Sequence, residues 1–148
     1  MPSGESARQK MIRLLALSKA DVYCDLGSGN GALLFEAARF PVKRIFGLEQ
    51  SVWLCTWTRL HAWIKKINIE LFNAQIPEFK LTQVPNRVSL FLMPKLFPLL
   101  EPFFSTLPKG ALVVSNMFPL TNSALTLITE EPDASFTENG KIYLYKKT

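Results

Sequence analysis

The sequence predicts an α/β protein with a doubly wound, Rossmann-like sheet, and three observations support this fold class. Apolar segments of strand length alternate with segments of helical periodicity along most of the chain. A glycine-rich turn follows the first apolar segment, and two strand-like segments with no helix between them close the chain. Because parallel strands need helical crossovers, the alternation indicates a parallel sheet. The closing pair indicates an antiparallel hairpin at one edge of that sheet.

The length and composition fit one globular domain. A chain of 148 residues can bury a sizeable core, and 48% of its residues are hydrophobic. We therefore expect residues 1–148 to form a single domain, with residues 1–20 as an N-terminal turn and helix packed on the core.

The charge pattern argues against a specific nucleic-acid partner. The net charge is +5, but the basic residues are scattered along the chain.

No apolar run approaches the ~18 residues of a membrane span, and the N-terminus lacks the apolar core of a signal peptide. The two cysteines, Cys24 and Cys55, lack metal-ligand spacing and fall in segments expected to be buried. These features predict a cytoplasmic protein with free thiols and no metal site.

The chain opens with a turn and a capped helix. Ser6 is a suitable N-cap, and apolar residues continue at helical spacing to about Leu17. Residues 21–26 form the first expected strand. Their nearly continuous apolar character is typical of a parallel strand covered on both faces.

Three glycines at alternate positions, Gly27, Gly29 and Gly31, follow this strand. Without Cβ atoms the turn can adopt positive φ, and a ligand can lie directly on its N–H groups. A helix expected over residues 32–40 begins at the turn. Asp25 places a carboxylate at the end of the strand, which suits a positively charged or hydrogen-bond-donating ligand group and disfavours a phosphate.

The second expected strand, residues 43–49, ends in Glu49 and completes a βαβ unit. Glu49 lies 18 residues beyond Gly31. Such folds place an acid that binds ribose hydroxyls at a separation of about 20 residues, so we expect this role for Glu49.

The third expected helix begins at the N-cap Ser51 and ends near Lys66. Apolar residues repeat along it at helical spacing, and we expect this stripe to face the core. Its members are Trp53, Trp57, Leu60 and Ile64. His61 is the chain's single histidine, so neither a Ser-His-Asp triad nor a histidine metal cluster can form. We expect His61 at the surface.

The remaining segments continue the alternation. A third strand ends at Asn73, and a connecting loop follows it. Two further strands are expected at 87–93 and 111–117, with a helical region from 94 to 105 between them. A terminal hairpin is expected from strands at 124–129 and 141–146, with a turn at Asn139-Gly140.

Residues 25–31, Asp-Leu-Gly-Ser-Gly-Asn-Gly, resemble the first motif of the seven-strand S-adenosylmethionine-dependent methyltransferases. The resemblance implies the strand order 3-2-1-4-5-7-6 and S-adenosyl-L-methionine as cofactor, with the motif's acid against the cofactor's ammonium group. A dinucleotide fold is the competing interpretation, because Gly27, Gly29 and Ala32 also satisfy the looser G-x-G-x-x-G/A fingerprint. Asp25, Gly31 and the closing hairpin favour the methyltransferase.

The chain resembles in particular the small relatives of the ATP synthase c-subunit lysine N-methyltransferase. Beyond the first motif, the similarity rests on four stretches: Pro2-Ser3, Glu49 with the helix containing Trp53, Leu92-Met93-Pro94, and Val113-Val114-Ser115. These relatives commonly carry an acid after the third strand that holds the adenine amino group. This chain has Asn73 there, which can accept the same hydrogen bond without charge assistance.

The resemblance and the strand ends together nominate two sets of site residues. The cofactor set is Asp25, Gly27, Ser28, Gly29, Gly31, Glu49, Gln50 and Asn73. The substrate-facing set is Ser3, Glu5, Met93, Pro94, Ser115, Asn116 and Phe118. Glu5 is a candidate to take a proton from a lysine, and no catalytic residue is assigned.

The expected function is S-adenosylmethionine-dependent methylation of an amine, with a protein lysine preferred over a small-molecule amine. Methylation of DNA adenine is disfavoured, because Leu92-Met93-Pro94-Lys95 stands where an Asn/Asp-Pro-Pro-Tyr type sequence would be expected. Two other classes stay open: a cofactor-binding interaction module without turnover and, with less support, an NAD-dependent oxidoreductase.

Overall fold

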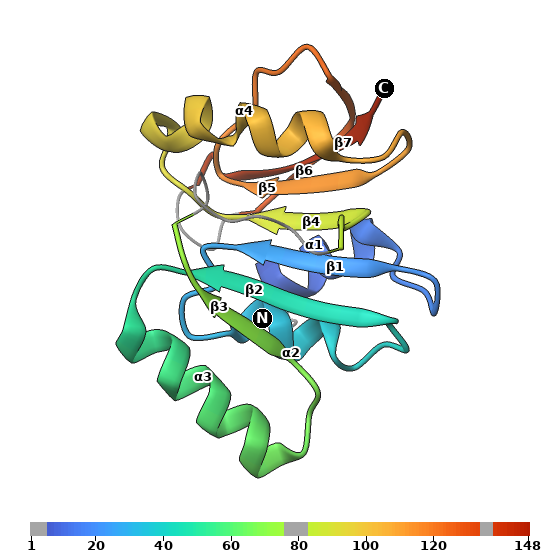
Figure 1. The fold of residues 1–148 in the computed structure, drawn as a ribbon. Coiled ribbons are helices and arrows are strands. Elements are labelled where there is room, and N and C mark those ends of the chain that lie inside the picture. Colours follow the sequence, from blue (N-terminus) through green and yellow to red (C-terminus); the bar gives the residue numbers. More distant parts are fainter. Residues whose placement is uncertain (1–5, 76–82, 134–137) are drawn as a thin grey trace.

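The computed structural model describes residues 6–75, 83–133 and 138–148. They contain one seven-stranded sheet in the order β3-β2-β1-β4-β5-β7-β6, which confirms the predicted order (Figure 1). β1 to β5 are parallel to one another, and β7 runs antiparallel to both β5 and β6. The strands are β1 (Val22–Leu26), β2 (Arg44–Glu49), β3 (Glu70–Asn73), β4 (Arg87–Leu90), β5 (Leu112–Asn116), β6 (Leu125–Pro132) and β7 (Lys141–Lys147).

Two of the helices, α1 and α3, begin at serine side-chain caps that the sequence predicted. Ser6 forms a capping box with Gln9 at the start of α1 (Ala7–Leu15), and the Ser51 hydroxyl accepts the Leu54 N–H at the start of α3 (Val52–Lys65). The helix α2 (Ala32–Ala37) ends three residues earlier than expected. A short 3₁₀ turn, η2 (Pro94–Leu96), leads into α4 (Phe97–Thr106).

Helices cover both faces of the sheet, as expected for a doubly wound fold. Leu100 and Phe104 of α4 pack on one face, whereas Met11 and Leu15 of α1 pack on the other. Figure 1 shows α1 and α2 behind the strands, α4 near β5, and α3 at the lower left beside β3. The described helices are all too short or too polar to span a bilayer.

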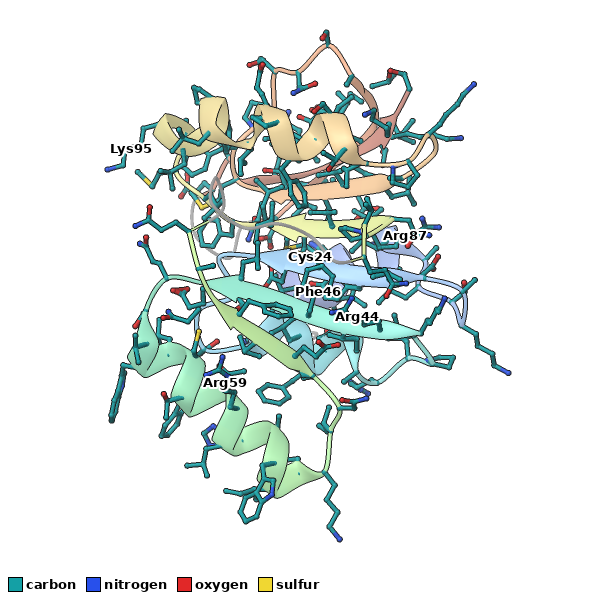
Figure 2. All side chains as sticks on the ribbon, viewed as in Figure 1. Cys24, Arg44, Phe46, Arg59, Arg87 and Lys95 are labelled. Carbon is teal, nitrogen blue, oxygen red and sulfur yellow. The ribbon has the colours of Figure 1, made fainter. Side chains whose placement is uncertain are left out.

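The β2–β3 edge is held by side chains that cross between the strands. Arg44 binds Glu70 through two hydrogen bonds of 2.7 and 3.0 Å, and its guanidinium lies 5.1 Å from the ring centre of Phe46 (Figure 2). This ion pair lowers the pKa of Glu70. The edge on which α3 packs is therefore anchored to the rest of the sheet.

The expectation that the apolar stripe of the third helix faces the core was wrong. Trp53 is 75% exposed, and Leu60 and Ile64 are 49% and 61% exposed. The buried residues of α3 are the smaller Cys55, Thr58 and Ala62. A small-residue face lets α3 approach the glycine turn and the β3 edge closely, which turns the large side chains outward.

Candidate functional site

The glycine turn is hydrogen-bonded to the end of β2. The backbone N–H groups of Gly27 and Ser28 both donate to the Leu48 carbonyl, at 2.8 and 3.0 Å, and the Gly29 N–H donates to Glu49 Oε1 at 3.1 Å. The sequence suggested that a ligand would lie on these N–H groups, but the protein itself already engages three of them. The turn therefore has few free N–H donors for an anion, although its backbone is not covered by side chains. This arrangement disfavours a pyrophosphate ligand.

The three glycines of the turn have different neighbours. A Cβ on Gly29 (φ +56) would have nothing within 4 Å, so its exposed side faces open space. A Cβ on Gly31 (φ +82) would lie 2.5 Å from Thr58 Cγ2 of α3. The structure therefore places Gly29 at the open side of the turn, whereas Gly31 permits contact between the turn and α3.

Asp25 is a buried carboxyl at the end of β1, with 2% exposure. Ser89 Oγ donates to Asp25 Oδ1 at 2.7 Å, and the Tyr23 hydroxyl lies 2.5 Å from the same Ser89 oxygen. Burial raises the pKa of Asp25 to about 7, the Ser89 hydrogen bond opposes that shift, and the nearby Glu49 charge adds to it. A cation bound here would restore the ionised form.

Ser89 was absent from the sequence-based site. It lies opposite Asp25 in the register of β1 and β4 and is fully buried. A lone hydroxyl within the otherwise apolar stretch from Val88 to Met93 is the signal that could have revealed it, because a buried hydroxyl requires a polar partner.

Glu49, at the end of β2, is held by backbone groups. Its Oε1 accepts the Gly29 N–H, and its Oε2 accepts the Ser51 N–H at 2.9 Å. One carboxylate thereby ties the glycine turn to the start of α3. Glu49 also lines a cavity, so its remaining lone pairs stay available to ligand hydroxyls.

Two cavities meet at Gly27. One, of about 220 Å³, lies between Glu49, Gln50 and the apolar side chains of Leu92 and Leu99. The other, of about 400 Å³, contains Asp25, Ser28, Gly29 and Asn116. The structure thus divides most of the predicted cofactor residues between two cavities that share Gly27, one largely apolar and lined by Glu49 and the other lined by the buried Asp25.

Asn73 ends β3, as expected, and its amide nitrogen is engaged by the protein itself. Its Nδ2 donates to the carbonyls of Glu49 and Gln50, at 3.1 and 2.9 Å, and the cavity wall is formed by the next two residues, Ala74 and Gln75. Its amide thus clamps the connection between β2 and α3.

The predicted substrate-facing residues do not form one group. Asn116 shares a cavity with Asp25, whereas Pro94 and Phe118 line a separate cavity of about 410 Å³ beside α4. Ser115 is buried, and its hydroxyl donates to the Phe118 carbonyl at 2.7 Å, so it shapes the turn after β5. Met93 is 57% exposed. The other two nominees, Ser3 and Glu5, lie outside the described residues.

The Asp25 cavity has further walls that the sequence did not indicate. Arg8, Met11 and Phe91 line it. Arg8 is exposed on α1 and brings a guanidinium to the cavity, which suits a ligand carboxylate. Nothing in the local pattern distinguishes Arg8 from an ordinary solvated arginine.

Comparisons with known proteins agree with this geometry. The family model described as the ANTKMT methyltransferase domain matches residues 25–126, which run from Asp25 to β6.

The chain belongs to the ANTKMT methyltransferase domain family.

Two relatives of this methyltransferase domain carry lysine N-methyltransferase names. The chain is 34% identical over 120 residues to the adenine nucleotide translocase lysine N-methyltransferase of Mus musculus, covering 79% of this chain and 52% of that protein. It is 25% identical over 125 residues to the ATP synthase c-subunit lysine N-methyltransferase of Xenopus laevis, covering 82% of this chain and 54% of that protein. The chain thus spans about half the length of these relatives.

A solved structure shares the fold of the whole domain. It is an RNA methyltransferase from Salinibacter ruber in complex with S-adenosyl-L-homocysteine, with a TM-score of 0.80 and 25% identity. The alignment covers 99% of this chain and 94% of that chain.

The residues present fit S-adenosylmethionine, the cofactor of methyltransferases with this fold. The buried Asp25 carboxyl suits the ammonium group, and Glu49 at the rim of the apolar cavity suits ribose hydroxyls. The Ser28 hydroxyl is buried without a hydrogen-bond partner among the described residues, which leaves a polar group free for a ligand. The apolar cavity beyond Glu49 would hold the adenine ring.

Proposed function

We propose that this protein uses S-adenosylmethionine to N-methylate the side chain of a protein lysine. Family membership and the names of the two relatives support a lysine acceptor. The observation that carries the proposal within this chain is the position of Asn116 in the cavity that contains Asp25.

Asn116 is suited to hold an amine. It is 4% exposed, and its Oδ1 lacks a hydrogen-bond partner among the described residues. A buried amide oxygen without a partner is costly, and an incoming N–H group would satisfy it. One hydrogen bond to Asn116 leaves the nitrogen lone pair free to point elsewhere in the cavity.

The chain's own contribution is positioning and desolvation. S-adenosylmethionine, when bound, would supply an activated methyl group, which the amine nitrogen would accept as the carbon–sulfur bond breaks. A lysine must lose its proton first, and the apolar walls formed by Met11, Leu33 and Phe91 favour the neutral amine. Holding the amine at ~3–3.5 Å in line with the breaking bond accounts for most of the required acceleration.

The proposal is tested by transfer of labelled methyl from S-adenosylmethionine into extracts of the source cells. We expect label in protein, and mass spectrometry should place it on lysine. Asn116→Ala should lower the turnover with little change in cofactor affinity, whereas Ser105→Ala, at an exposed position on α4, is a matched control. Label in small amines or RNA would replace the lysine proposal, and no transfer despite cofactor binding would favour an interaction module.

We also propose a cytoplasmic location. The free, buried thiols of Cys24 and Cys55 fit a reducing compartment. Fractionation of source cells with an antibody to the chain tests this, and recovery from an oxidising compartment would contradict it.

A further inference from the structure

The outward side of α3 forms an unusual surface for a small protein. Its apolar side chains are 46–78% exposed, and all three tryptophans of the chain lie on this helix. We call these residues the outer face of α3: Val52, Trp53, Trp57, Leu60, Trp63 and Ile64. A contiguous exposed apolar surface of this kind marks an interaction site.

The outer face is continuous and largely apolar. Successive members lie three or four residues apart or are adjacent, so they share one side of a helix that is ~21 Å long. Thr56 lies among them and donates its hydroxyl to the Val52 carbonyl at 2.8 Å. Its hydrogen bond is therefore kept within the helix, and the face can be covered without leaving this donor unpaired.

The rim of the outer face is positively charged. Arg59, Lys65 and Lys66 are exposed on or directly after α3, and Lys65 Nζ lies 4.8 Å from the ring centre of Phe35. No acidic residue occurs between Glu49 and Glu70. Arg59 donates to the Leu71 carbonyl at 2.7 Å, which fixes its guanidinium on the side of α3 that faces β3 (Figure 2). Both of the bounding acids are engaged, Glu49 by backbone N–H groups and Glu70 by Arg44. The partner surface should therefore be negatively charged.

We propose that the outer face of α3 docks on an anionic lipid bilayer, with the helix lying in the plane of the membrane surface. Exposed tryptophans beside lysine and arginine on a helix are the composition of interfacial membrane-binding helices. The helix α3 also lies at the edge of the molecule, as Figure 1 shows. A bilayer accepts protruding aromatic rings without a complementary groove, whereas a protein partner would have to supply one.

A second copy of the chain fits this surface less well. A twofold contact would place the same face against itself, and this face carries cations but no acid. The basic rims would then repel each other without compensation. The charge pattern therefore favours an anionic lipid surface over self-association.

Tryptophan fluorescence gives a direct test, because all three reporters lie on α3. The full chain is mixed with vesicles of phosphatidylcholine alone or of phosphatidylcholine with phosphatidylserine. We expect co-sedimentation and a blue-shifted emission with the anionic vesicles, and much weaker effects with the neutral ones. Lipids brominated in their acyl chains should quench the emission. Absence of quenching by anionic brominated vesicles would overturn the proposal.

Variants separate the apolar and electrostatic contributions. Trp53→Ser with Trp63→Ser should abolish co-sedimentation, whereas Leu127→Ser with Ile128→Ser, at exposed apolar positions on β6, should not. Neutralising Lys65 and Lys66, as Lys65→Gln and Lys66→Asn, should lower binding to anionic vesicles roughly twenty- to thirtyfold, at about fivefold per lysine. Asparagine suits position 66, whose φ is +57.

Two results would contradict docking on lipid. If the tryptophan variant and the parent bound vesicles equally, the lipid contact would lie outside the outer face of α3. A blue shift without vesicles, accompanied by a doubled mass in sedimentation, would show that a second copy covers the face. Circular dichroism checks that each variant is folded, and the quenching measurement on the parent decides the question if the tryptophan variant is not.

Discussion

Asp25 and Glu49 end neighbouring strands, yet their surroundings are opposite. The buried Asp25 carboxyl accepts a hydrogen bond from the Ser89 hydroxyl, and burial raises its pKa to about 7. Glu49 is held on both oxygens by backbone N–H groups. The comparison shows that two acids which look equivalent in the sequence have different roles. Asp25 is suited to bind a cationic ligand group, whereas Glu49 also stabilises the glycine turn through its hydrogen bonds.

The largest effect is expected at the glycine between these two carboxylates. Gly29→Val should abolish binding of S-adenosylhomocysteine, because the new side chain would project into the open side of the turn. Gly110→Val is the matched control, since Gly110 also has positive φ and open space but lies in the turn before β5. Calorimetry on both variants makes the test. Retained binding by the Gly29 variant would place the ligand elsewhere.

Glu49→Ala should both weaken cofactor binding and destabilise the fold. The substitution removes acceptors for ligand hydroxyls and for two backbone N–H groups, so the dissociation constant should rise about ten- to more than a hundredfold. Glu49→Gln keeps one oxygen acceptor and should fall between the variant and the parent. Calorimetry and thermal melting report the two effects separately, and an unchanged melting temperature would rule out the structural role.

Asp25→Asn should weaken cofactor binding about tenfold or more without destabilising the unliganded protein. Hydrogen bonds to charged groups contribute ~1.5–3 kcal/mol, and the amide removes the charge. Ser89→Ala should have a smaller effect through the same carboxyl, because Ser89 Oγ donates to it. If Asp25→Asn binds as tightly as the parent, the ammonium group does not meet Asp25.

Cofactor affinity should depend on pH through Asp25. The folded-state pKa of about 7 lies above the ordinary value of 3.8, so the unliganded fold loses stability through this group as pH rises from 3.8 to about 7. A bound cation requires the ionised form, which is about half populated at pH 7 and roughly a tenth at pH 6. Affinity should therefore fall about fivefold between pH 7 and pH 6. Titration calorimetry of the parent and of Asp25→Asn checks this, and the variant should lose the dependence.

The smallest effect is expected at Asn73. From the sequence alone, Asn73→Asp would tighten cofactor binding by supplying a charged acceptor to the adenine. The structure reverses the expected sign, because the side chain donates to two carbonyls that a carboxylate would repel. We expect about fivefold weaker binding, from ~1 kcal/mol of lost hydrogen bonding, together with a lower melting temperature. Tighter binding would restore the original interpretation.

The strand order was implied by the resemblance to the seven-strand methyltransferases, and the structure confirms it. The sequence itself shows the alternation of strands and helices and the closing hairpin, two local signals that agree with that order. It could not predict which side of the third helix is buried. Cys55, Thr58 and Ala62 are spaced three and four residues apart, as are the large apolar residues, so the helix carries two stripes of valid periodicity. Hydrophobicity favoured the wrong one, because close packing against the turn requires small side chains.

Only the residues of the candidate site that lie next to the glycine-rich turn could be predicted from the sequence. Asp25 and Glu49 are such residues, because three alternating glycines are recognisable without a structure. Ser89 and Asn73 act through register and through side-chain donors to distant carbonyls, and these relations exist only once the strands are paired.

Thr58 lies under the glycine turn, with its hydroxyl 3.5 Å from the Gly29 carbonyl and its methyl group filling the space beside Gly31. The helix α3 and the glycine turn are therefore in direct contact. Thermodynamic linkage then applies: whatever factor a bound surface on α3 contributes to cofactor affinity, the cofactor contributes to the affinity for that surface. For any factor other than one, the supply of methyl donor would set how much of this protein is bound at such a surface.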